Sequence, residues 1–483
     1  MSISSAAPGQ PYTVTIEKLT HGGAGLTHIE GIPVFVTDSI PGQVLEIVIT
    51  KNKDTYREAK VTKVIRKAKD EVMPRCSHFH DCGGCVWQNL PYDKQISYKE
   101  DIVRETLEHL TPADEAVRKS LPGRVLNIIP SPQVYHYRNK LEMSFGYQHM
   151  RSEEQNGRRI YFDENPTIGF HQPGQWSTVL PITECHLYDE QIAVLLASVR
   201  RFMETSRLPV FNPKTQKGML RTLLLRRGIQ TGEQMVCFLV HARKKELEPL
   251  FQRFLTHFGG RSQLKSLLIV EHLGLSDKPE HPKIHTLIGK PTITERLFDL
   301  SFEISPFSFF QTNTLGAEKL YRAIAETADL SLRDTVLDAY CGMGTIGQYL
   351  ARFCQRVVGV ESHPSAIEDA LKSAGKNKIS NISFYKGRTE QVLLEQLKPG
   401  GKYAFDVVVL DPPRAGLHPK ALGAVIEHAP KKIVYVSCNT ATLARDLGGF
   451  LKAGYELRTV QPVDLFPHTA HIESVSLLQR KEA

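Results

Sequence analysis

The stretch KKIVYVSCNTATLARDL, Lys431 to Leu447, decides how the second half of the chain folds. An apolar, β-branched run ends at Ser437 and a helical pattern opens at Thr440, which predicts a strand followed at once by a helix. Cys438 therefore lies on a strand-to-helix turn, where ligands bind in parallel α/β sheets. A thiol at such a turn is a nucleophile where a base or a helix amino terminus lowers its pKa. A buried structural cysteine is the alternative.

Seven apolar runs make up the carboxyl-terminal part of the chain. The first five alternate with helical intervals, which predicts a doubly wound parallel sheet. The last two have no room for a crossover helix between them, so they predict an antiparallel hairpin at the edge of the sheet. The predicted strands are 335–342, 356–362, 382–387, 405–413, 432–438, 455–463 and 471–479. This ending is typical of the fold of S-adenosylmethionine-dependent methyltransferases.

A glycine-rich turn follows the first of these strands. Gly342, Gly344 and Gly347 fit the pattern G-x-G-x-x-G, which suits a dinucleotide as well as S-adenosylmethionine. The acid that ends the second strand, Glu361, is placed to hold ribose hydroxyls in either case. The acidic-Pro-Pro turn at Asp411 favours the methyl donor, because it is common in methyltransferases that act on amino groups or bases. A nicotinamide oxidoreductase is the weakest alternative.

The amino-terminal segment alternates apolar and polar positions over residues 10–67, between glycine and proline breaks. Five short strands in so few residues predict a small β-barrel. The segment Lys51–Asp70 carries eight Lys or Arg against three acids, an electrostatic footprint for RNA, with a solvated face as the alternative. Together these features resemble a TRAM domain, an oligonucleotide-binding barrel found on RNA-modifying enzymes.

Four cysteines predict a metal site. Cys76, Cys82 and Cys85 lie within ten residues, and Cys185 is the best candidate for a fourth ligand. Four thiolates suit either a [4Fe-4S] cluster or structural zinc. Zinc sites usually pair two C-x-x-C motifs, so the uneven spacing here favours iron–sulfur. The spacing of a radical enzyme is absent.

The central segment, residues 134–290, is rich in strand patterns and carries two basic patches, 135–140 and 220–227. Aromatic residues interleaved with cations, Arg138 among them, suit single-stranded RNA because bases stack on rings and phosphates pair with charge, so both patches are expected to contact RNA. Ordinary charges on edge strands are the alternative.

Composition bounds the class of protein. The chain has 483 residues, of which 41% are hydrophobic and 23% charged, and the length predicts two to four domains. No apolar run approaches the roughly 18 residues of a membrane helix, and the first residues lack the features of a secretory signal. Eight unevenly spaced cysteines do not suggest a disulfide framework. We therefore expect a cytoplasmic protein with no membrane partner.

Taken together, the motifs resemble the RNA uracil-5 methyltransferases, specifically the TRAM-bearing, iron–sulfur branch that modifies 23S ribosomal RNA. The likeness spans nearly the whole chain. Besides the cysteines, it rests on 308–314 (SFFQTNT), 338–347 (DAYCGMGTIG), 359–362 (GVES), 410–417 (LDPPRAGL), 434–447 (VYVSCNTATLARDL) and 466–478 (FPHTAHIESVSLL).

The resemblance implies an α/β fold: a Rossmann-like S-adenosylmethionine-dependent methyltransferase domain preceded by a small TRAM or OB-like barrel and a β-rich central domain. The expected boundaries are 1–70 for the barrel, 71–300 for the central domain with the cysteine site, and 301–483 for the catalytic domain. A monomer is expected.

The resemblance also implies the chemistry. Cys438 matches the nucleophile that adds to carbon 6 of uracil, and Glu473 matches the base that removes the proton from carbon 5. The product is 5-methyluridine in 23S ribosomal RNA, with a transfer RNA uridine as the alternative. An RNA-binding or assembly factor that retains only the fold is a third hypothesis, although none of its expected motif damage is visible.

The remaining site residues implied by the resemblance bind the cofactor or the substrate. The expected cofactor contacts are Gln311, Tyr340, Gly342, Gly344, Thr345, Glu361 and Asp411. Phe309 is expected to stack near the flipped base. Arg138 is expected to contact the RNA because it belongs to the basic patch 135–140. Two positions depart from the family pattern: Tyr340 replaces a frequent Phe, and Thr345 stands where a polar amide often occurs.

Overall fold

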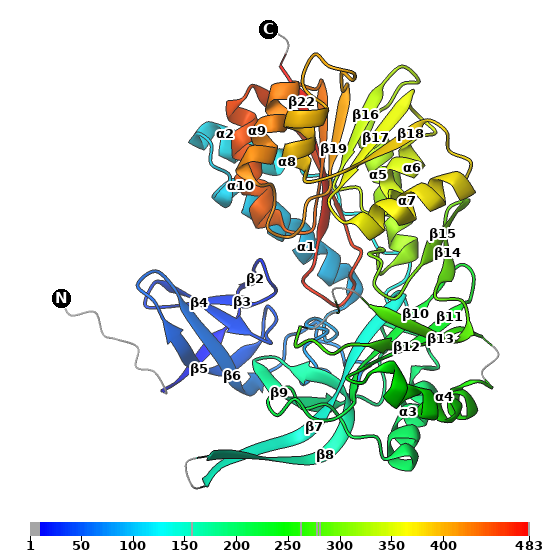
Figure 1. The fold of residues 1–483 in the computed structure, drawn as a ribbon. Coiled ribbons are helices and arrows are strands. Elements are labelled where there is room, and N and C mark those ends of the chain that lie inside the picture. The colour runs from blue at the N-terminus through cyan, green and yellow to red at the C-terminus, as the bar shows by residue number, and fades with distance from the viewer. Residues whose placement is uncertain (1–9, 156–157, 261–262, 277–278, 280–281, 482–483) are drawn as a thin grey trace. The chain divides into compact units, whose positions relative to one another are not determined.

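The structure is a computed structural model that describes residues 10–155, 158–260, 263–276, 279 and 282–481 (Figure 1). The chain divides into two compact units. The first unit consists of Met1–Pro74, Gly84–Val134 and Gly316–Ala483, and the second of Arg75–Gly83 and Tyr135–Leu315. The amino-terminal sheet and the carboxyl-terminal sheet thus belong to the same unit. The domain boundaries expected from the sequence stay a prediction.

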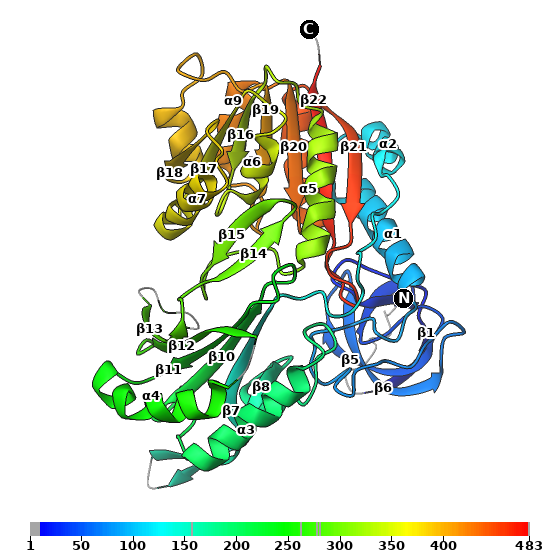
Figure 2. The same ribbon diagram turned by 90° about the vertical axis from the view of Figure 1, so that its right-hand side faces the viewer.

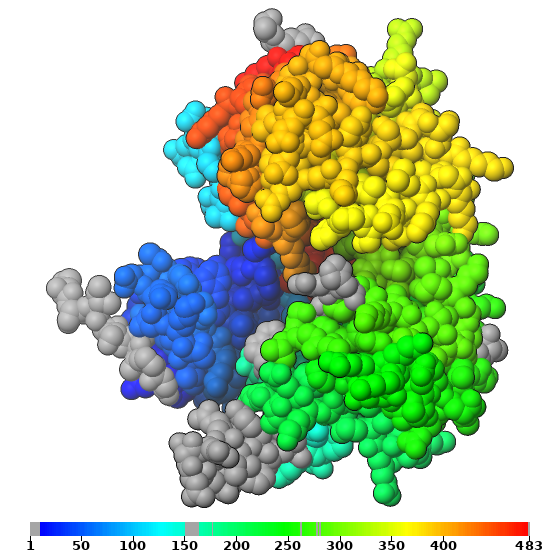
Figure 3. Space-filling view, in the orientation of Figure 1, coloured from blue at the N-terminus to red at the C-terminus, as the bar shows by residue number. Residues whose placement is uncertain are grey.

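The amino-terminal strands form one small sheet in the order β1-β5-β6-β4-β3-β2. Their bounds are β1 Pro11–Thr15, β2 Lys18–Leu19, β3 Gly25–Ile29, β4 Ile32–Thr37, β5 Val44–Asn52 and β6 Arg57–Arg66. The backbone N–H of Ile16 donates to Gln43, beside β5, and that of Glu17 donates to Leu26 in β3, so the sheet closes on itself. Alternate side chains such as Val34 and Leu45 are buried inside it. The carboxyl half of β6 is exposed, and the surface of this sheet appears in blue in Figure 3.

The carboxyl-terminal strands form a seven-stranded sheet in the order β18-β17-β16-β19-β20-β22-β21. Their bounds are β16 Thr335–Ala339, β17 Arg356–Glu361, β18 Ile382–Lys386, β19 Val407–Leu410, β20 Lys432–Ser437, β21 Tyr455–Val463 and β22 Glu473–Arg480. The first five strands are parallel to one another, and β22 pairs antiparallel with both β20 and β21. The predicted doubly wound sheet with an antiparallel edge hairpin is confirmed, with β22 as the inner strand of that hairpin.

Helices cover both faces of this sheet: α5, α6 and α7 lie on the face turned toward the viewer in Figure 2, and α9 and α10 lie on the other face, as Figure 1 shows. Their bounds are α5 Thr314–Ala328, α6 Thr345–Leu350, α7 Pro364–Lys376, α8 Thr389–Gln391, a π-helical turn Val392–Gln396, α9 Pro419–His428 and α10 Thr440–Lys452. Helix α1, Tyr92–Leu110, packs against α10 and is followed by α2, Glu115–Ser120, and a 3₁₀ turn, Leu121–Arg124. Among the described residues no helix is both long and apolar enough to cross a bilayer.

The second unit is rich in strands, as predicted, around the sheet β13-β12-β11-β10-β7-β8-β9. The bounds are β7 Lys140–Gln155, β8 Arg158–Gln172, β9 Gln175–Pro181, β10 Leu220–Arg227, β11 Gln234–Val240, β12 Leu264–Glu271 and β13 Lys283–Gly289. Helices α3, Ile192–Ser206, and α4, Lys244–Phe258, bury Phe202, Phe254 and Phe258 against Phe238 of the sheet. A separate hairpin, β14 Ile293–Leu297 and β15 Leu300–Ile304, completes the unit.

Candidate active site

Strand register brings Cys438 and Glu473 to the same edge of the seven-stranded sheet. Strand β20 ends at Ser437, which pairs with Ser474 of the antiparallel strand β22. Cys438 follows the carboxyl end of β20, and Glu473 is the first residue of β22, so both lie at the edge where ligands bind in parallel sheets. Glu473 lowers the tendency of Cys438 to ionise, which places the two side chains within electrostatic reach.

The turn that carries Cys438 is fixed by its neighbours. Asn439 caps helix α10, because its side-chain oxygen accepts a hydrogen bond of 3.1 Å from the backbone N–H of Ala441. The amide nitrogen of the same side chain donates to the carbonyl oxygen of Arg414 at 3.2 Å. The turn after β20 is therefore tied to the turn after β19. Cys438 lies just before the positive end of the helix, which favours the thiolate.

The site is acidic and largely buried. Burial, with Glu473 and Asp411 nearby, raises the pKa of the Cys438 thiol to about 11, while Arg414 acts in the opposite direction. Burial and the neighbouring Asp411 raise the pKa of Glu473 to about 8, and Arg414 again opposes them. Burial raises the pKa of Asp411 to about 7. A carboxyl group that titrates near neutral pH is suited to general base catalysis, and an added positive charge would favour ionisation of all three acidic groups.

The glycine turn has the geometry of a ligand cradle. Gly342 has a φ of +56°, no atom lies within 4 Å of where its Cβ would stand, and its N–H donates to Glu361 at 3.2 Å. Gly344 has a φ of +75°, and a Cβ there would meet the Phe384 ring at 2.8 Å. A Cβ on Gly347 would lie 2.7 Å from the Asp338 carboxylate. The second and third glycines allow close packing, while the first leaves open space beside Glu361, so these residues fit S-adenosylmethionine.

Tyr340 and Thr345 flank this turn. Tyr340 is half-buried with a left-handed φ of +65°, and burial raises the pKa of its hydroxyl to about 12. The hydroxyl of Thr345 lies 2.7 Å from the hydroxyl of Tyr321, so it already has a partner within the protein. Their roles as cofactor contacts stay predictions.

Three predicted residues, Phe309, Gln311 and Arg138, belong to the second unit. Phe309 is 72% exposed, which is unusual for an aromatic side chain and suits stacking on a base. The main-chain oxygen of Gln311 accepts a hydrogen bond of 2.8 Å from the side-chain amide of Asn139. The side chain of Gln311 takes no part in this bond. Burial raises the pKa of the Cys185 thiol while Arg138 acts in the opposite direction, so Arg138 lies within electrostatic reach of a predicted metal ligand.

The second basic patch predicted for RNA, 220–227, has another role. Arg226 is only 2% exposed and donates to the main-chain oxygens of Pro306 and Ser308. Arg227 pairs with Asp189 at 2.7 Å and donates to two further main-chain oxygens. The prediction of RNA contacts is therefore wrong for these two arginines. Arg226 instead holds the loop that presents Phe309.

The four predicted cysteine ligands are divided between the units. The eight cysteines are all described, and no disulfide joins any of them. In the second unit Cys76 and Cys185 lie within electrostatic reach of each other. Cys185 accepts hydrogen bonds from the backbone N–H groups of Leu187 and Tyr188, a pattern that tunes the sulfur ligands of iron–sulfur clusters.

Cys85 belongs to the first unit, where the side-chain amide of Gln88 donates to its sulfur at 3.2 Å. Within the part of the chain that the structure describes, no three or more His, Cys, Asp or Glu side chains gather closely enough to hold a metal ion. The described geometry thus does not assemble the cysteine set. The cluster stays a prediction, and no step of the chemistry depends on it.

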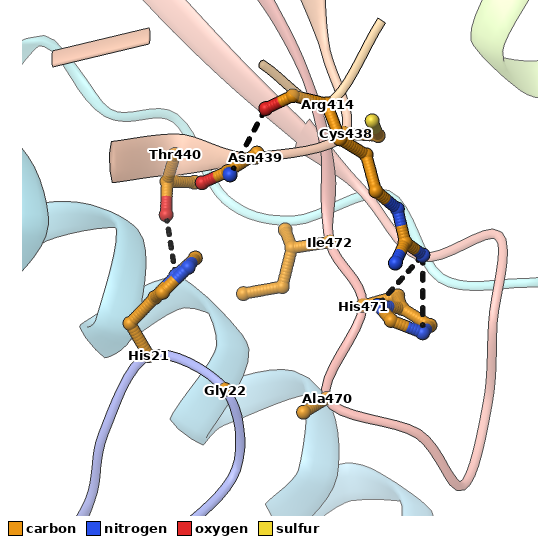
Figure 4. Close-up of a pocket in the computed structure, with 9 residues that line it drawn as sticks. All are labelled: His21, Gly22, Arg414, Cys438, Asn439, Thr440, Ala470, His471 and Ile472. Atoms are coloured by element: carbon orange, nitrogen blue, oxygen red, sulfur yellow. Dashed lines mark hydrogen bonds between the residues drawn. The ribbon is translucent and has the colours of Figure 1, made fainter. Parts of the chain in front are cut away.

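A cavity of about 160 Å³ opens beside Cys438, as Figure 4 shows. A single water needs only about 10–15 Å³, so the cavity has room for a small ring. Arg414 and His471 line it and lie 3.3 Å apart at their nearest nitrogens. Its lining residues are His21, Gly22, Arg414, Cys438, Asn439, Thr440, Ala470, His471 and Ile472.

Sequence reasoning assigned no role to Arg414, His471 or His21. The first two had a signal, because Arg414 ends the acidic-Pro-Pro turn and His471 lies two residues before Glu473. His21 had none, since it is on a turn of the amino-terminal sheet.

A buried polar network fixes the segment that leads to Glu473. Lys99 of α1 pairs with Asp464 at 2.7 Å, and both side chains are fully buried. The hydroxyl of Tyr92 donates to the same carboxylate at 2.9 Å. Gln95 accepts a hydrogen bond of 2.8 Å from the backbone N–H of His468. Helix α1 therefore positions one wall of the site, and breaking such a buried pair is costly because it leaves a charge unpaired.

Comparison with known proteins places this geometry in context. Residues 292–481 match the family model described as tRNA (uracil-5-)-methyltransferase, and residues 6–62 match the TRAM domain. A relative from Caldanaerobacter subterraneus, named an uncharacterized RNA methyltransferase, is 34% identical over 98% of this chain and 100% of its own length. One of the same description from Bacteroides thetaiotaomicron is 35% identical, over 95% of this chain and 99% of its own.

A solved structure covers nearly the whole chain as well. The tRNA (uracil-54, C5)-methyltransferase of Pyrococcus abyssi, in complex with S-adenosyl-L-homocysteine, superposes with a TM-score of 0.72 at 29% identity. The match covers 97% of this chain and 100% of that one.

Proposed function

Because the chain belongs to the RNA uracil-5-methyltransferase family with a TRAM domain, we propose that it methylates carbon 5 of a specific uridine in 23S ribosomal RNA. Methylation of carbon 5 of uracil in RNA, with S-adenosylmethionine as the methyl donor, follows from the family and the relatives. The observation that carries the mechanism is the pairing of Ser437 with Ser474, which brings a thiol and a carboxyl group to one edge of the sheet.

The chemistry needs both groups. Carbon 5 of uracil is a poor nucleophile, so the sulfur of Cys438 first adds to carbon 6 and makes carbon 5 electron-rich. S-adenosylmethionine supplies the methyl group as an electrophile. Glu473 then removes the proton from carbon 5, and the bond between Cys438 and carbon 6 breaks by elimination. Arg414 favours the ionised form of both residues.

The residues that hold the donor and the base belong to the same proposal. Glu361, Asp411 and the turn Tyr340–Thr345 would bind S-adenosylmethionine together with Gln311, while Phe309 would stack on the base and Arg138 would contact the RNA. Calorimetry with Glu361→Gln tests the cofactor site, with Glu395→Gln as the control. Binding equal to the wild type in Glu361→Gln would contradict its assignment.

Ribosomal RNA is proposed as the substrate because the amino-terminal sheet offers a surface for a long polyanion. Lys60, Lys63 and Arg66 are exposed along β6, next to the exposed Val64 and Ile65. Arg57 of the same predicted stripe is instead buried and donates to Asn52. Exposed cations beside apolar side chains suit single-stranded RNA.

Transfer RNA is the second candidate, favoured by the likeness to the Pyrococcus abyssi enzyme, whose name specifies uracil 54 of tRNA. Mass-spectrometric mapping of 5-methyluridine in a deletion strain separates the two. Loss from 23S ribosomal RNA alone supports the proposal. Loss from transfer RNA alone overturns it.

A [4Fe-4S] cluster held by Cys76, Cys82, Cys85 and Cys185 is also proposed, and it is supported by their uneven spacing and by the N–H groups around the Cys185 sulfur. Protein purified without oxygen should be brown and contain about four iron and four sulfide per chain. A colourless protein with stoichiometric zinc would overturn the iron assignment. We also propose that the protein is a monomer and that it is located in the cytoplasm.

A further inference from the structure

The turn between β2 and β3 of the amino-terminal sheet has a fixed shape. Gly22 and Gly23 have φ values of +87° and +92°, in the left-handed region that other residues rarely adopt. The hydroxyl of Thr20 donates to the carbonyl oxygen of Ala24 at 2.9 Å, and the N–H of Gly23 donates to the carbonyl oxygen of Thr20 at 2.9 Å. The turn therefore presents His21 in one orientation.

This turn is seated on the segment that precedes the catalytic carboxyl group. A Cβ on Gly23 would lie 2.7 Å from the side chain of Ala470, so only glycine allows this approach. The indole N–H of the fully buried Trp87 donates to the carbonyl oxygen of Gly23 at 3.4 Å. The N–H of Val86 donates to the carbonyl oxygen of His468 at 2.9 Å. Residues 86–87 thus join the turn to the segment 468–472.

His21 reaches the cavity beside Cys438, and Figure 4 shows its ring next to Thr440. Its Nδ1 lies 3.1 Å from the hydroxyl of Thr440, the first residue of α10. The His21 side chain is exposed to the cavity, and partial desolvation lowers the pKa of its imidazole. A neutral imidazole with Nδ1 engaged offers Nε2 as its second hydrogen-bonding atom.

The opposite side of the cavity is built from the catalytic sheet. Arg414, His471 and Cys438 line the cavity there, and the dashed lines in Figure 4 mark the contact between Arg414 and His471. The cavity beside Cys438 is therefore lined both by residues of the β2–β3 turn and by residues that follow β19 or precede β22.

Resting on the proposed function, we propose that His21 is a substrate-contacting residue of the reaction: the β2–β3 turn closes one wall of the uridine pocket, and His21 hydrogen-bonds the target nucleotide. The partner is a polar group of that nucleotide, either on the uracil ring or the ribose 2′-hydroxyl. The amino-terminal sheet would then do more than hold RNA at a distance, because it completes the pocket in which the base reacts.

The first experiment compares His21→Ala and His21→Gln with the control His28→Ala. His28 lies on the neighbouring strand β3, is exposed, and pairs with Glu17 at 3.1 Å. Losing one neutral hydrogen bond should lower kcat/KM for the RNA by about 3–10-fold in His21→Ala. Gln should restore part of the loss, and the affinity for S-adenosylmethionine by calorimetry should not change. A kcat/KM for His21→Ala equal to that of His28→Ala would overturn the inference.

A second experiment tests the seating of the turn. Gly23→Ala should push the turn away from Ala470 and lower kcat/KM, whereas Gly31→Ala introduces similar backbone strain with no atom near its Cβ. The melting temperatures of the two variants provide the check on folding. Equal kcat/KM values in the two variants would contradict the proposal.

An RNA with 2′-deoxyuridine at the target position identifies the partner atom. If the effect of His21→Ala disappears on this RNA, the partner is the ribose hydroxyl, and if it persists, the partner is the uracil ring. Both results support the contact. Wild-type enzyme that methylates no uridine in the mapped RNA would instead refute the proposed function, which keeps the two failures distinct.

Discussion

The catalytic edge of the seven-stranded sheet and the cysteine segment differ in how the backbone fixes their side chains. Cys438 and Glu473 are held by a strand pairing, Ser437 with Ser474, that belongs to the ladder of the sheet. Residues 75–91, all described, form only turns and bends, with left-handed φ values at His80 and Gly83. The fold itself fixes the geometry of a site built on paired strands, so the chemistry of that site can be inferred from the fold. Cysteine ligands on turns take their geometry from the metal or cluster that they bind.

The largest effect should come from Cys438→Ala. Removing the nucleophile should lower methyl transfer by about 10⁴-fold or more and abolish the covalent adduct with RNA that contains 5-fluorouridine. Transfer of radiolabelled methyl and denaturing gel electrophoresis measure the two effects. Cys354→Ala is the matched control, because this thiol lies in the same unit and has a pKa that burial also raises to about 11. Full methyl transfer by Cys438→Ala would show that the edge does not supply the nucleophile.

The next effect tests the partner on β22. Glu473→Gln keeps the shape and removes the base, so turnover should fall by about 10²–10⁴-fold. The methylated adduct should accumulate on natural uridine RNA, because elimination requires removal of the carbon 5 proton. Gel mobility under denaturing conditions measures the adduct, with Glu456→Gln on β21 as the control. A Glu473→Gln enzyme that turns over normally without trapped adduct would separate this residue from the chemistry.

A smaller effect on catalysis should come from the four predicted cysteine ligands. Cys185→Ser should lose bound iron and lower the melting temperature by several degrees, because a bound metal contributes to folding free energy. Affinity for S-adenosylmethionine should stay near that of the wild type. Cys237→Ser is the control, since this cysteine is buried in the sheet at β11. Iron retained at the wild-type level would remove Cys185 from the ligand set.

The catalytic edge could be predicted from the sequence because its signals are local. Apolar, β-branched runs marked the strands to within a few residues, and the short interval between the last two runs required a hairpin. The hairpin by itself leaves open which of its strands pairs with β20, and the structure shows that it is β22. The role of Glu473 was therefore expected from the family resemblance, and its proximity to Cys438 comes from the strand pairing in the structure.

Other features depend on long-range packing that leaves no periodic trace. Arg226 reads as a surface cation, yet it is buried because the loop 305–310 folds over it. His21 reaches the cavity only because Gly23 and Ala470 pack together. The four cysteines show which ligands are available. Their spacing along turns fixes no angles or distances between the sulfur atoms, so the sequence could predict the type of cluster but not its geometry.

The smallest effect is on stability. It reports how much the buried acidic groups at the catalytic edge lower the free energy of unfolding. Folded chains keep protons on Glu473 and Asp338 up to about pH 8 and on Asp411 up to about pH 7, whereas unfolded chains release them near pH 4. The unfolded state therefore binds fewer protons over this interval, and the free energy of unfolding falls as pH rises, by at most about 1.4 kcal/mol per pH unit for each retained proton.

Glu473→Gln removes one of these protons, so its stability should fall less steeply between pH 5 and pH 8 and exceed that of the wild type at pH 9. In a Trp176→Phe background, Trp87 is the sole tryptophan, and its fluorescence during urea unfolding reports on the first unit. The exposed Glu395→Gln should leave the slope unchanged. If the free energy of unfolding changed with pH in the same way for Glu473→Gln and the wild type, Glu473 would be ionised in the folded protein. Burial of this residue would then not lower the stability as pH rises.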